Sequence, residues 1–496
     1  MGLGILFFLS SGLFLGWSLG ANDAANVFGT AVGSRMVRFR TAATVCSVFV
    51  ILGAVLGGAG AANTLDRLGS VNTLAGAFTV ALAAALATFA MTRLGMPIST
   101  SQAIVGAIIG WNLYAGMVTG TRTLSTIVAS WILCPLLAAV VAVALYIVMR
   151  QILRRGHLHL LRQDALVRWG LLLVGAFASY SLGANNIANV MGVFLPDNPF
   201  RDVTVLGVTF SGTQQLFLLG GTAIAIGVMT YSERTVRMIG SGLMRLSPEA
   251  ALVIVGAQAL VLFLFASERL EFWLASHGLP TFPLVPVSST QVVIGAIVGL
   301  GLMRGGRGIQ LRPLGSVGLG WVATPVVAGL VAFFLLFFVD NVFDQQVARV
   351  VHYRIDDTVL ARYELEGRPA ARVAAWSGRE GANALRLQNE LEREAALTRD
   401  EAQRLLELAE LAPIVVDLGR AGLDLDRDYL GVVETRALAT LAGQRYEHRW
   451  QFADALAAAS PLWRLRKETP LNRSWNASVR DKLAYVERVF REQPAP

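Results

Sequence analysis

The hydrophobic positions divide the chain into a long apolar part and a shorter polar part. Apolar runs long enough for membrane helices follow one another up to residue 339, separated by short polar joints. From residue 340 onward, apolar positions alternate with charged ones at helical spacing. We therefore predict an all-α, polytopic membrane protein with a soluble, mostly helical C-terminal domain at residues 340–496. The apolar runs are 3–33, 41–61, 73–93, 97–113, 123–149, 168–195, 203–229, 249–266, 286–303 and 314–339.

The charges follow the same division. Residues 1–339 contain 9 acidic and 19 basic residues, whereas residues 340–496 contain 25 acidic and 23 basic ones. The basic excess lies in the joints of the apolar part, which indicates membrane topology rather than a nucleic-acid partner. Cys46 and Cys134 lie in apolar runs, where a cysteine is typically a small buried residue, so we expect neither a disulfide nor a metal site formed by them.

The apolar part contains an internal repeat, with one copy at residues 1–150 and the other at 167–339. Each copy opens with Gly-Ala-Asn and later contains a Pro-x-Ser segment, a Gln-x3-Gly-Ala-Ile-x-Gly segment and a Trp-x3-Pro segment. The glycines spaced by four in the third landmark predict close helix packing. In order, the paired landmarks begin at Gly20 and Gly183, Pro97 and Pro286, Gln102 and Gln291, and Trp131 and Trp321.

The joints decide the number of crossings. Only Leu94 to Met96 separate the runs 73–93 and 97–113, which favours a re-entrant hairpin over two full crossings. Irregular backbone at membrane depth is tolerated where it lines a cavity. We predict a broken helix at each Gly-Ala-Asn motif and one hairpin in each half. Each half then crosses three times, and the two repeats are inverted.

The basic joints predict the sidedness. Arg35, Arg38 and the loop 150–168 fall on one side, whereas Arg67 and Arg201 fall on the other. The side richer in arginine is expected in the cytoplasm. We therefore predict a multi-pass protein of the cell (inner) membrane whose N- and C-termini both lie outside.

A carboxylate at membrane depth marks the first candidate site. Asp23 lies in an apolar run, where an ionised group is costly and therefore suggests function. A structural hydrogen-bond cluster between helices is the alternative. The repetition of the motif favours a cation site for Na⁺ or a proton, to which the second copy contributes amides but no charge. The predicted cation-binding residues are Asn22, Asp23, Asn26, Asn185, Asn186 and Asn189.

Two hydroxyl-rich segments mark the second candidate site. Each follows a proline and precedes an apolar helix, where Ser and Thr commonly cap free N–H groups. Two facing helix N-termini would also form a cradle of N–H groups and hydroxyls for an anion. With Asp23 nearby, a cation-coupled anion site is the better interpretation. The predicted anion-binding residues are Ser99, Thr100, Ser101, Gln102, Ser288, Ser289, Thr290 and Gln291.

These motifs together resemble the inorganic phosphate transporter (PiT) family over most of residues 1–339. The resemblance implies a secondary transporter that imports phosphate with Na⁺ or H⁺, with inverted repeats and outward termini. It implies no enzymatic activity and no cofactor beyond the coupling ion. The chain departs from the family at Asn186, where many members have Asp. Residues 267–283 lengthen the second hairpin, and residues 340–496 lie outside the family core.

Two alternatives remain open from the sequence. Some bacterial relatives of the family carry sulfate, and the motifs do not separate sulfate from phosphate. A membrane sensor or scaffold that acts through residues 340–496 is a different class of function, but it has no need for a duplicated intramembrane site. The expected partners are phosphate or sulfate, Na⁺ or H⁺, and the lipid bilayer; association into a homo-oligomer is left open.

Overall fold

The structure, a computed structural model, describes residues 3–93, 98–156, 159–205, 208–242, 247–306, 311–421 and 429–491. The chain forms two compact units. The first contains residues 1–115, 119–271 and 281–349, and the second contains residues 116–118, 272–280 and 350–496.

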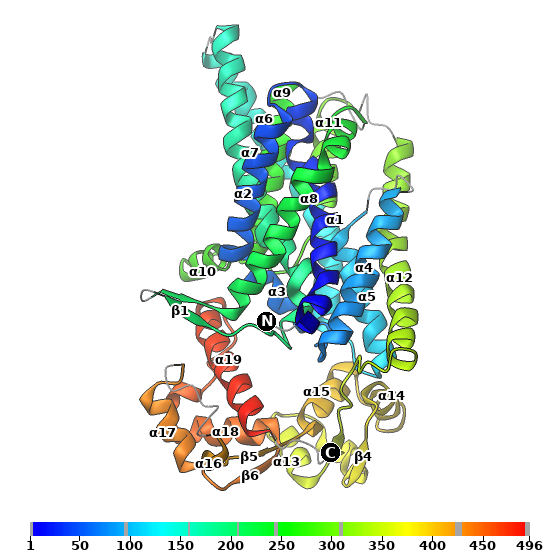
Figure 1. Cartoon of the computed structure of the whole chain (residues 1–496), viewed down its shortest axis with the longest axis vertical. Helices are drawn as coiled ribbons and strands as arrows, with labels where there is room; N and C mark the ends of the chain where they lie inside the picture. The colour runs from blue at the N-terminus through cyan, green and yellow to red at the C-terminus, as the bar shows by residue number, and fades with distance from the viewer. Residues whose placement is uncertain are drawn as a thin grey trace. The chain divides into compact units, whose positions relative to one another are not determined.

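The first unit is built from long helices that run side by side (Figure 1). They form because a membrane offers no water to backbone groups, so a spanning segment must satisfy its peptides internally. The helices of the first half are α1 (Leu3–Gly33), α2 (Phe39–Gly57), α3 (Ala59–Asp66), α4 (Leu74–Arg93), α5 (Thr100–Ala115) and α6 (Thr121–Gly156). Those of the second half are α7 (Leu160–Met191), α8 (Gly212–Gly242), α9 (Pro248–Ala266), α11 (Ser289–Met303) and α12 (Leu311–Asn341). A 3₁₀ turn at Gly192–Phe194 and the hairpin of β1 (Val203–Val205) and β2 (Val208–Phe210) follow α7. Helix α10 (Glu268–Ser276) begins in the first unit, and its residues from Phe272 onward belong to the second.

The two halves exchange partners in a reciprocal pattern. Helix α1 packs against α8 and α7 packs against α2, while α5 packs against α12 and α11 packs against α6. We call α4 with α5 the first hairpin and α9 with α11 the second hairpin. The predicted close packing of the spaced glycines is confirmed in α5 and α11. A Cβ on Gly106 would lie 2.1 Å from the Pro325 carbonyl oxygen, and one on Gly295 would lie 2.2 Å from that of Pro135.

The predicted helix breaks are wrong. Helices α1 and α7 continue through both Gly-Ala-Asn motifs. The glycines there serve close packing instead, because a Cβ on Gly20 would lie 2.0 Å from the Ile224 carbonyl oxygen and one on Gly183 would lie 2.1 Å from that of Val50. In an apolar environment an unpaired peptide costs more than the low helix propensity of glycine, so the helix stays intact.

The number of long apolar helices also differs from the prediction. Among the described residues, eight helices have the length and composition to cross a membrane, four in each half. Helix α4, predicted as a hairpin arm, and its counterpart α9 are 20 and 19 residues long and belong to this set. Pro97, the first residue of one predicted landmark, lies outside the described residues.

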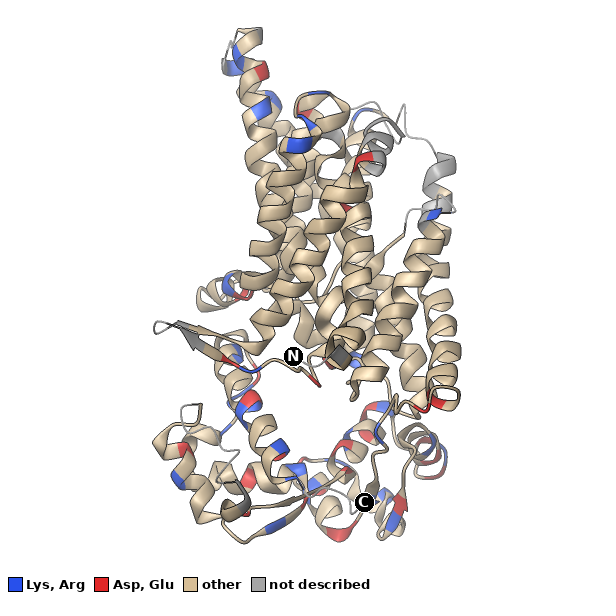
Figure 2. Ribbon diagram, viewed as in Figure 1, with Lys and Arg blue, Asp and Glu red and all other residues tan. Residues whose placement is uncertain are grey.

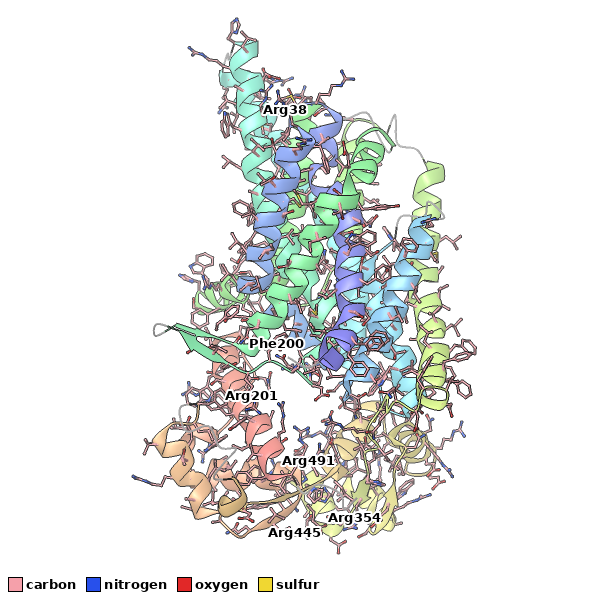
Figure 3. The ribbon with its side chains drawn as sticks, in the orientation of Figure 1. Arg38, Phe200, Arg201, Arg354, Arg445 and Arg491 are labelled. Carbon is pink, nitrogen blue, oxygen red and sulfur yellow. The ribbon has the colours of Figure 1, made fainter. Side chains whose placement is uncertain are left out.

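Most charged groups of the first unit lie near the helix ends, and Asp23 inside α1 is an exception. Figure 2 shows long uncharged stretches along its helices. Arg38 and Arg201, predicted on opposite sides, lie at opposite ends of this unit (Figure 3). Cys46 and Cys134 are free and buried, as predicted.

The second unit combines helices with short strands, and its charged residues are spread throughout (Figure 2). Strand β3 (Tyr353–Ile355) pairs with β4 (Arg379–Gly381), and β5 (Leu411–Val415) pairs with β6 (Arg445–His448), both antiparallel. The helices are α13 (Asp357–Leu365), α14 (Ala384–Glu394), α15 (Arg399–Ala409), α16 (Leu418–Ala421), α17 (Val432–Thr440), α18 (Arg449–Ala459) and α19 (Arg473–Phe490), with four 3₁₀ turns at Ala370–Arg372, Ala374–Trp376, Pro461–Trp463 and Pro470–Asn472.

Two hydrophobic clusters organise the second unit, one from Tyr353 to Ala409 and one from Ile414 to Phe490. Buried His448 lies where they meet, with Nε2 3.1 Å from Asp356 Oδ2 and Nδ1 3.0 Å from the Glu410 carbonyl oxygen. A capping box starts α15: the Thr398 side chain accepts from the Glu401 N–H, and the Glu401 side chain accepts from the Thr398 N–H.

Candidate transport site

Asp23 occupies a buried position in α1 and accepts three hydrogen bonds from neutral donors. Oδ2 accepts from Ser289 Oγ at 2.7 Å and from Asn186 Nδ2 at 3.1 Å, and Oδ1 accepts from Asn22 Nδ2 at 3.1 Å. Asp23 itself is only 3% exposed. Neutral donors disperse the charge of a carboxylate without cancelling it, so this position favours a cation or a proton as partner.

The first motif reaches across to the second hairpin. Asn26 Nδ2 lies 3.3 Å from Ser289 Oγ and 3.3 Å from Thr290 Oγ1, and both hydroxyls belong to the first turn of α11. Together with the bond from Ser289 to Asp23, these contacts join the carboxylate to one of the predicted anion-binding segments. A change in the charge of Asp23 would therefore act directly on the hydroxyls of Ser289 and Thr290.

The second motif reaches the first hairpin in the reciprocal way. Asn189 Nδ2 donates to Ser101 Oγ at 2.8 Å and approaches Asn186 Oδ1 at 3.3 Å. Ser101 Oγ in turn donates to the Val287 carbonyl oxygen at 3.2 Å, which links the first hairpin to the second. Both predicted segments and both motifs thus meet in one connected hydrogen-bond network.

Asn185 holds the backbone of the second hairpin. Its Nδ2 donates to the Val287 carbonyl oxygen at 2.7 Å, and its Oδ1 accepts from the Val287 N–H at 3.0 Å. Val287 was not among the predicted site residues. The signal for it was weak: a residue outside helices and strands has peptide groups that must find other partners, such as a neighbouring side chain.

The remaining predicted residues lie at the two helix starts. Ser99 Oγ accepts from the Gln102 N–H, and Ser288 Oγ accepts from the Gln291 N–H, both at 3.3 Å. These are capping bonds, as the simpler interpretation predicted. They leave the helices α5 and α11 with N-termini that begin at Thr100 and Ser289, next to the network.

Several buried oxygens of the site have no hydrogen-bond partner within the described residues. Because a buried unpaired acceptor costs free energy, a group of them suggests a place for a cation or for a ligand that donates. These atoms are Thr100 Oγ1, Gln102 Oε1, Asn189 Oδ1 and Gln291 Oε1.

The site has opposite character at its two components. Two helix N-termini and several hydroxyls favour an anion. The carboxylate and the unpaired amide oxygens favour a cation. The two components together suit a site that binds ions of opposite charge.

Comparison with known proteins agrees with this geometry. A family model described as the phosphate transporter family matches residues 19–163, 159–332 and 273–387. The chain is similar to a protein of Methanocaldococcus jannaschii named "Putative phosphate permease", with 26% identity over 322 residues that cover 65% of this chain and 93% of the relative. It is also similar to the sulfate permease CysP of Bacillus subtilis, with 27% identity over 330 residues that cover 65% of this chain and 85% of the relative.

A solved structure described as "The sodium-dependent phosphate transporter" has a similar fold. The TM-score is 0.51 at 21% sequence identity, and the match covers 68% of this chain and 100% of that chain. The fold is therefore that of a polytopic helical transporter. With the family model matching well over half of its residues, the chain belongs to the phosphate transporter family.

Proposed function

We propose that this protein is a secondary transporter that imports inorganic phosphate together with Na⁺ or H⁺. The observation that carries the proposal is the hydrogen bond between Asp23 and Ser289, because it joins a buried carboxylate to the start of a helix suited to an anion. Family membership supports the substrate, and the sodium-dependent phosphate transporter of similar fold supports Na⁺ as the coupling ion.

Asp23 would provide the charge of the cation site. Neutral oxygens from Asn22, Asn26, Asn186 and Asn189 would complete it, since Na⁺ prefers several oxygen ligands. Asn185, also predicted as a ligand, would instead hold the peptide of Val287 beside the site. A proton could replace Na⁺ at the carboxylate alone. In either case the cation removes a negative charge that would repel an approaching phosphate, because Coulomb repulsion is strong where water is excluded. Cation binding would therefore raise phosphate affinity, which is the basis of coupling.

The hydroxyls and helix N-termini of the two hairpins would hold the phosphate. Donors come from Ser99, Thr100, Ser101, Ser288, Ser289 and Thr290 and from the free N–H groups of α5 and α11. Gln102 and Gln291 carry the unpaired oxygens, which could accept from a phosphate hydroxyl. Sulfate lacks such a hydroxyl at neutral pH, so these oxygens favour phosphate.

Sulfate is the second candidate substrate because the sulfate permease of Bacillus subtilis is among the relatives. Uptake of labelled phosphate into proteoliposomes, driven by an inward Na⁺ or H⁺ gradient, would test the choice. We expect accumulation of phosphate that excess unlabelled sulfate reduces only weakly. Accumulation of sulfate with no uptake of phosphate would overturn the assignment.

We further propose that residues 1–150 and 167–339 are inverted repeats. The reciprocal pairing of α1 with α8 and of α7 with α2 supports this arrangement. The distribution of arginine supports a cytoplasmic location for the end that contains Arg38, with the termini outside. Cysteine labelling of intact cells would test the orientation: Ser377→Cys should react with an impermeant reagent, and Ser241→Cys should not.

Transport by residues 1–344 alone would reject the alternative that the protein is mainly a sensor or scaffold.

The two native cysteines are buried and would contribute little background in the labelling experiment.

A further inference from the structure

Three residues that join α5 to α6 belong to the second compact unit. The Gly116 carbonyl oxygen accepts a hydrogen bond from the Leu385 N–H at 2.9 Å. Tyr353 Oη lies 3.8 Å from Met117 Sδ, and Val118 packs against the hydrophobic cluster that runs from Tyr353 to Ala409. Each residue of Gly116–Val118 is therefore held by the C-terminal part of the chain.

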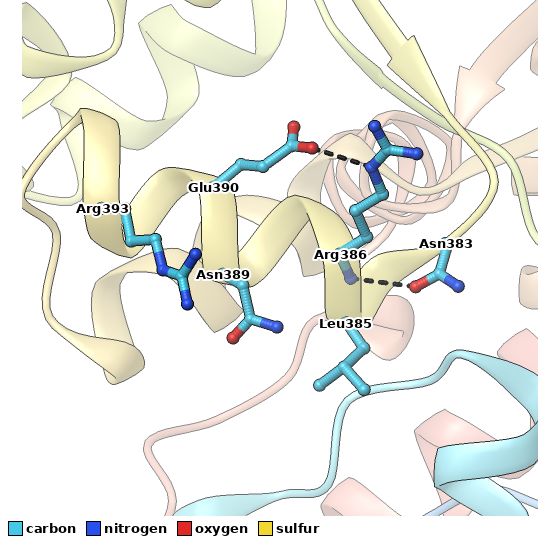
Figure 4. A pocket seen from close by; sticks show the side chains of 6 residues that line it. All are labelled: Asn383, Leu385, Arg386, Asn389, Glu390 and Arg393. Atoms are coloured by element: carbon cyan, nitrogen blue, oxygen red, sulfur yellow. Dashed lines mark hydrogen bonds and ion pairs between the residues drawn. The ribbon is translucent and has the colours of Figure 1, made fainter.

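Gly116 fits this contact in a way that another residue would not. Its φ is +66°, a left-handed conformation that favours glycine, and a Cβ there would lie 2.5 Å from Asn383 Nδ2. Asn383 cannot move freely because it caps α14: its Oδ1 accepts from the Arg386 N–H at 2.9 Å (Figure 4). The first turn of α14 thus forms a fixed contact surface for Gly116. Asn383 and Leu385 also line an open pocket of about 370 Å³.

Helix α5 connects this contact to the transport site. Its last residue, Ala115, precedes Gly116, and its first turn contains Thr100 and Ser101. Ser101 bonds with Asn189 and Val287 at the centre of the network. A helix of 16 residues with intact backbone hydrogen bonds is stiff, so a displacement at one end is passed to the other.

Contacts along α5 prevent it from absorbing such a displacement by bending or sliding. Gly106 lies directly against the backbone of Pro325 in α12. Near the other end, Trp111 Nε1 donates to the Val347 carbonyl oxygen at 2.9 Å, and Tyr114 Oη donates to Asp340 Oδ2 at 2.7 Å. Helix α5 is therefore tied to α12 and to the segment that follows it at several points along its length.

We propose that residues 350–491 form a regulatory domain that holds Gly116–Val118 and thereby restrains the first hairpin. Release of this clamp lets the α5 N-terminus, with Thr100 and Ser101, open more often. By reciprocity, a ligand or partner that alters the first turn of α14 changes ion binding at the hairpin. The consequence for transport rests on the proposed function, whereas the mechanical coupling does not.

Hydrogen–deuterium exchange of the full chain, without added anion, tests the coupling. Val118→Asp places a charge against the hydrophobic cluster, and Val118→Ala removes part of the contact with less risk to folding. Val432→Asp and Val432→Ala are the matched controls, because Val432 is 77% exposed on α17. We expect the Val118 variants to speed exchange both in the first turn of α14 and at the amides of Gln102 and Ala103, by about fivefold or more.

The result at the two places separates the possibilities. Faster exchange in α14 with unchanged exchange at Gln102 and Ala103, in both Val118 variants, would show that the contact is local and would overturn the proposal. Unchanged exchange at both places would show that the clamp restrains nothing, with the same consequence. Because this readout needs no phosphate, it fails or succeeds independently of the substrate assignment.

Discussion

The two copies of the polar motif occupy matching positions in the repeats but differ in charge. In the first copy, Asn22 and Asp23 bond with each other and the carboxylate faces Ser289. In the second copy, Asn186 stands where the carboxylate would be, and Asn185 is committed to the peptide of Val287. The same shape is thus used once for charge and once for positioning.

The two copies also differ in which hairpin their side chains contact. The second copy fixes the second hairpin through Asn185 and the first hairpin through Asn189 and Ser101. Within the described residues, the hydrogen bonds that Asp23 and Asn26 make to the hairpins go to Ser289 and Thr290 of the second one. A cation at Asp23 would therefore act first on Ser289 and Thr290, and its effect would reach the first hairpin through Val287 and Ser101.

Asp23→Asn should have the largest effect, because it makes the two copies alike. The variant keeps the shape of the side chain, but it removes the charge and replaces one accepting oxygen with an NH₂ group. Loss of the partner of a buried ion costs about 3 kcal/mol or more, which corresponds to over a hundredfold in cation affinity. We expect cation-driven accumulation of phosphate in proteoliposomes to be abolished. Asp164→Asn, at a half-exposed position of α7, is the control and should accumulate phosphate normally.

Asn186→Asp makes the two copies alike in the opposite way, because it gives the second copy a carboxylate as well. It places a second carboxylate where Asn186 Nδ2 now lies 3.1 Å from Asp23 Oδ2. Two carboxylates at this distance share a proton or bind an additional cation. We expect uptake to stay within about tenfold of the native rate and to depend more steeply on Na⁺ concentration or pH. A variant with native dependence on both would show that the two positions are not electrostatically coupled.

Gln102→Leu and Gln291→Leu compare the two hairpins directly. Each removes an unpaired buried oxygen from the first turn of α5 or α11. If a phosphate hydroxyl donates to these oxygens, each loss costs about 1–2 kcal/mol, or roughly tenfold in phosphate affinity. Affinity for sulfate should change less. Equal losses for both anions, measured by competition in uptake, would remove the argument that these oxygens select phosphate.

Glu366→Gln tests a carboxylate of the opposite kind, one that has its own cation. Arg404 donates to both oxygens of Glu366 at 2.6 and 2.8 Å, and this pairing lowers the pKa of Glu366 below its ordinary value of 4.5. A lowered pKa stabilises the folded state above about pH 4.5, and the stabilisation is lost as the pH falls further.

The effect of Glu366→Gln on stability should be small, about 1 kcal/mol or less, because the pair is partly exposed. Urea unfolding of the full chain, followed by circular dichroism, should show a smaller acid-induced loss of stability in the variant than in the native protein. Glu364→Gln, in the last turn of α13 two residues before Glu366, is the control. An identical acid response in Glu366→Gln and the native chain would show that the pair is not coupled to folding.

The positions of the site residues could be predicted from the sequence because they repeat. A lone carboxylate in an apolar run and two Pro-x-Ser segments are local signals, and all of these residues except Pro97 fall in the described parts of the chain. The exchange between halves, in which Asn26 reaches Ser289 and Asn189 reaches Ser101, could not be predicted, because spacing along one chain does not specify which helices become neighbours.

The errors of the sequence-based prediction have physical causes. Gly20 and Gly183 were interpreted as helix breakers, but glycine also permits backbones to touch, and here that role prevails. Strands β3 to β6 were not predicted, since segments of three to five residues carry too little periodicity to be recognised. The contact of Gly116 with α14 depends on a left-handed φ, and a single glycine in the sequence does not reveal that its φ is positive.

The central claim is that the Asp23 carboxylate binds the coupling cation. Equilibrium binding of labelled phosphate to the purified protein, titrated with Na⁺ at several pH values, tests it without the complications of transport. We predict that phosphate affinity of the native protein rises with Na⁺ or proton concentration and that Asp23→Asn shows no such rise. The same dependence on Na⁺ and pH in both proteins would contradict the claim and would leave Asp23 with a structural role only.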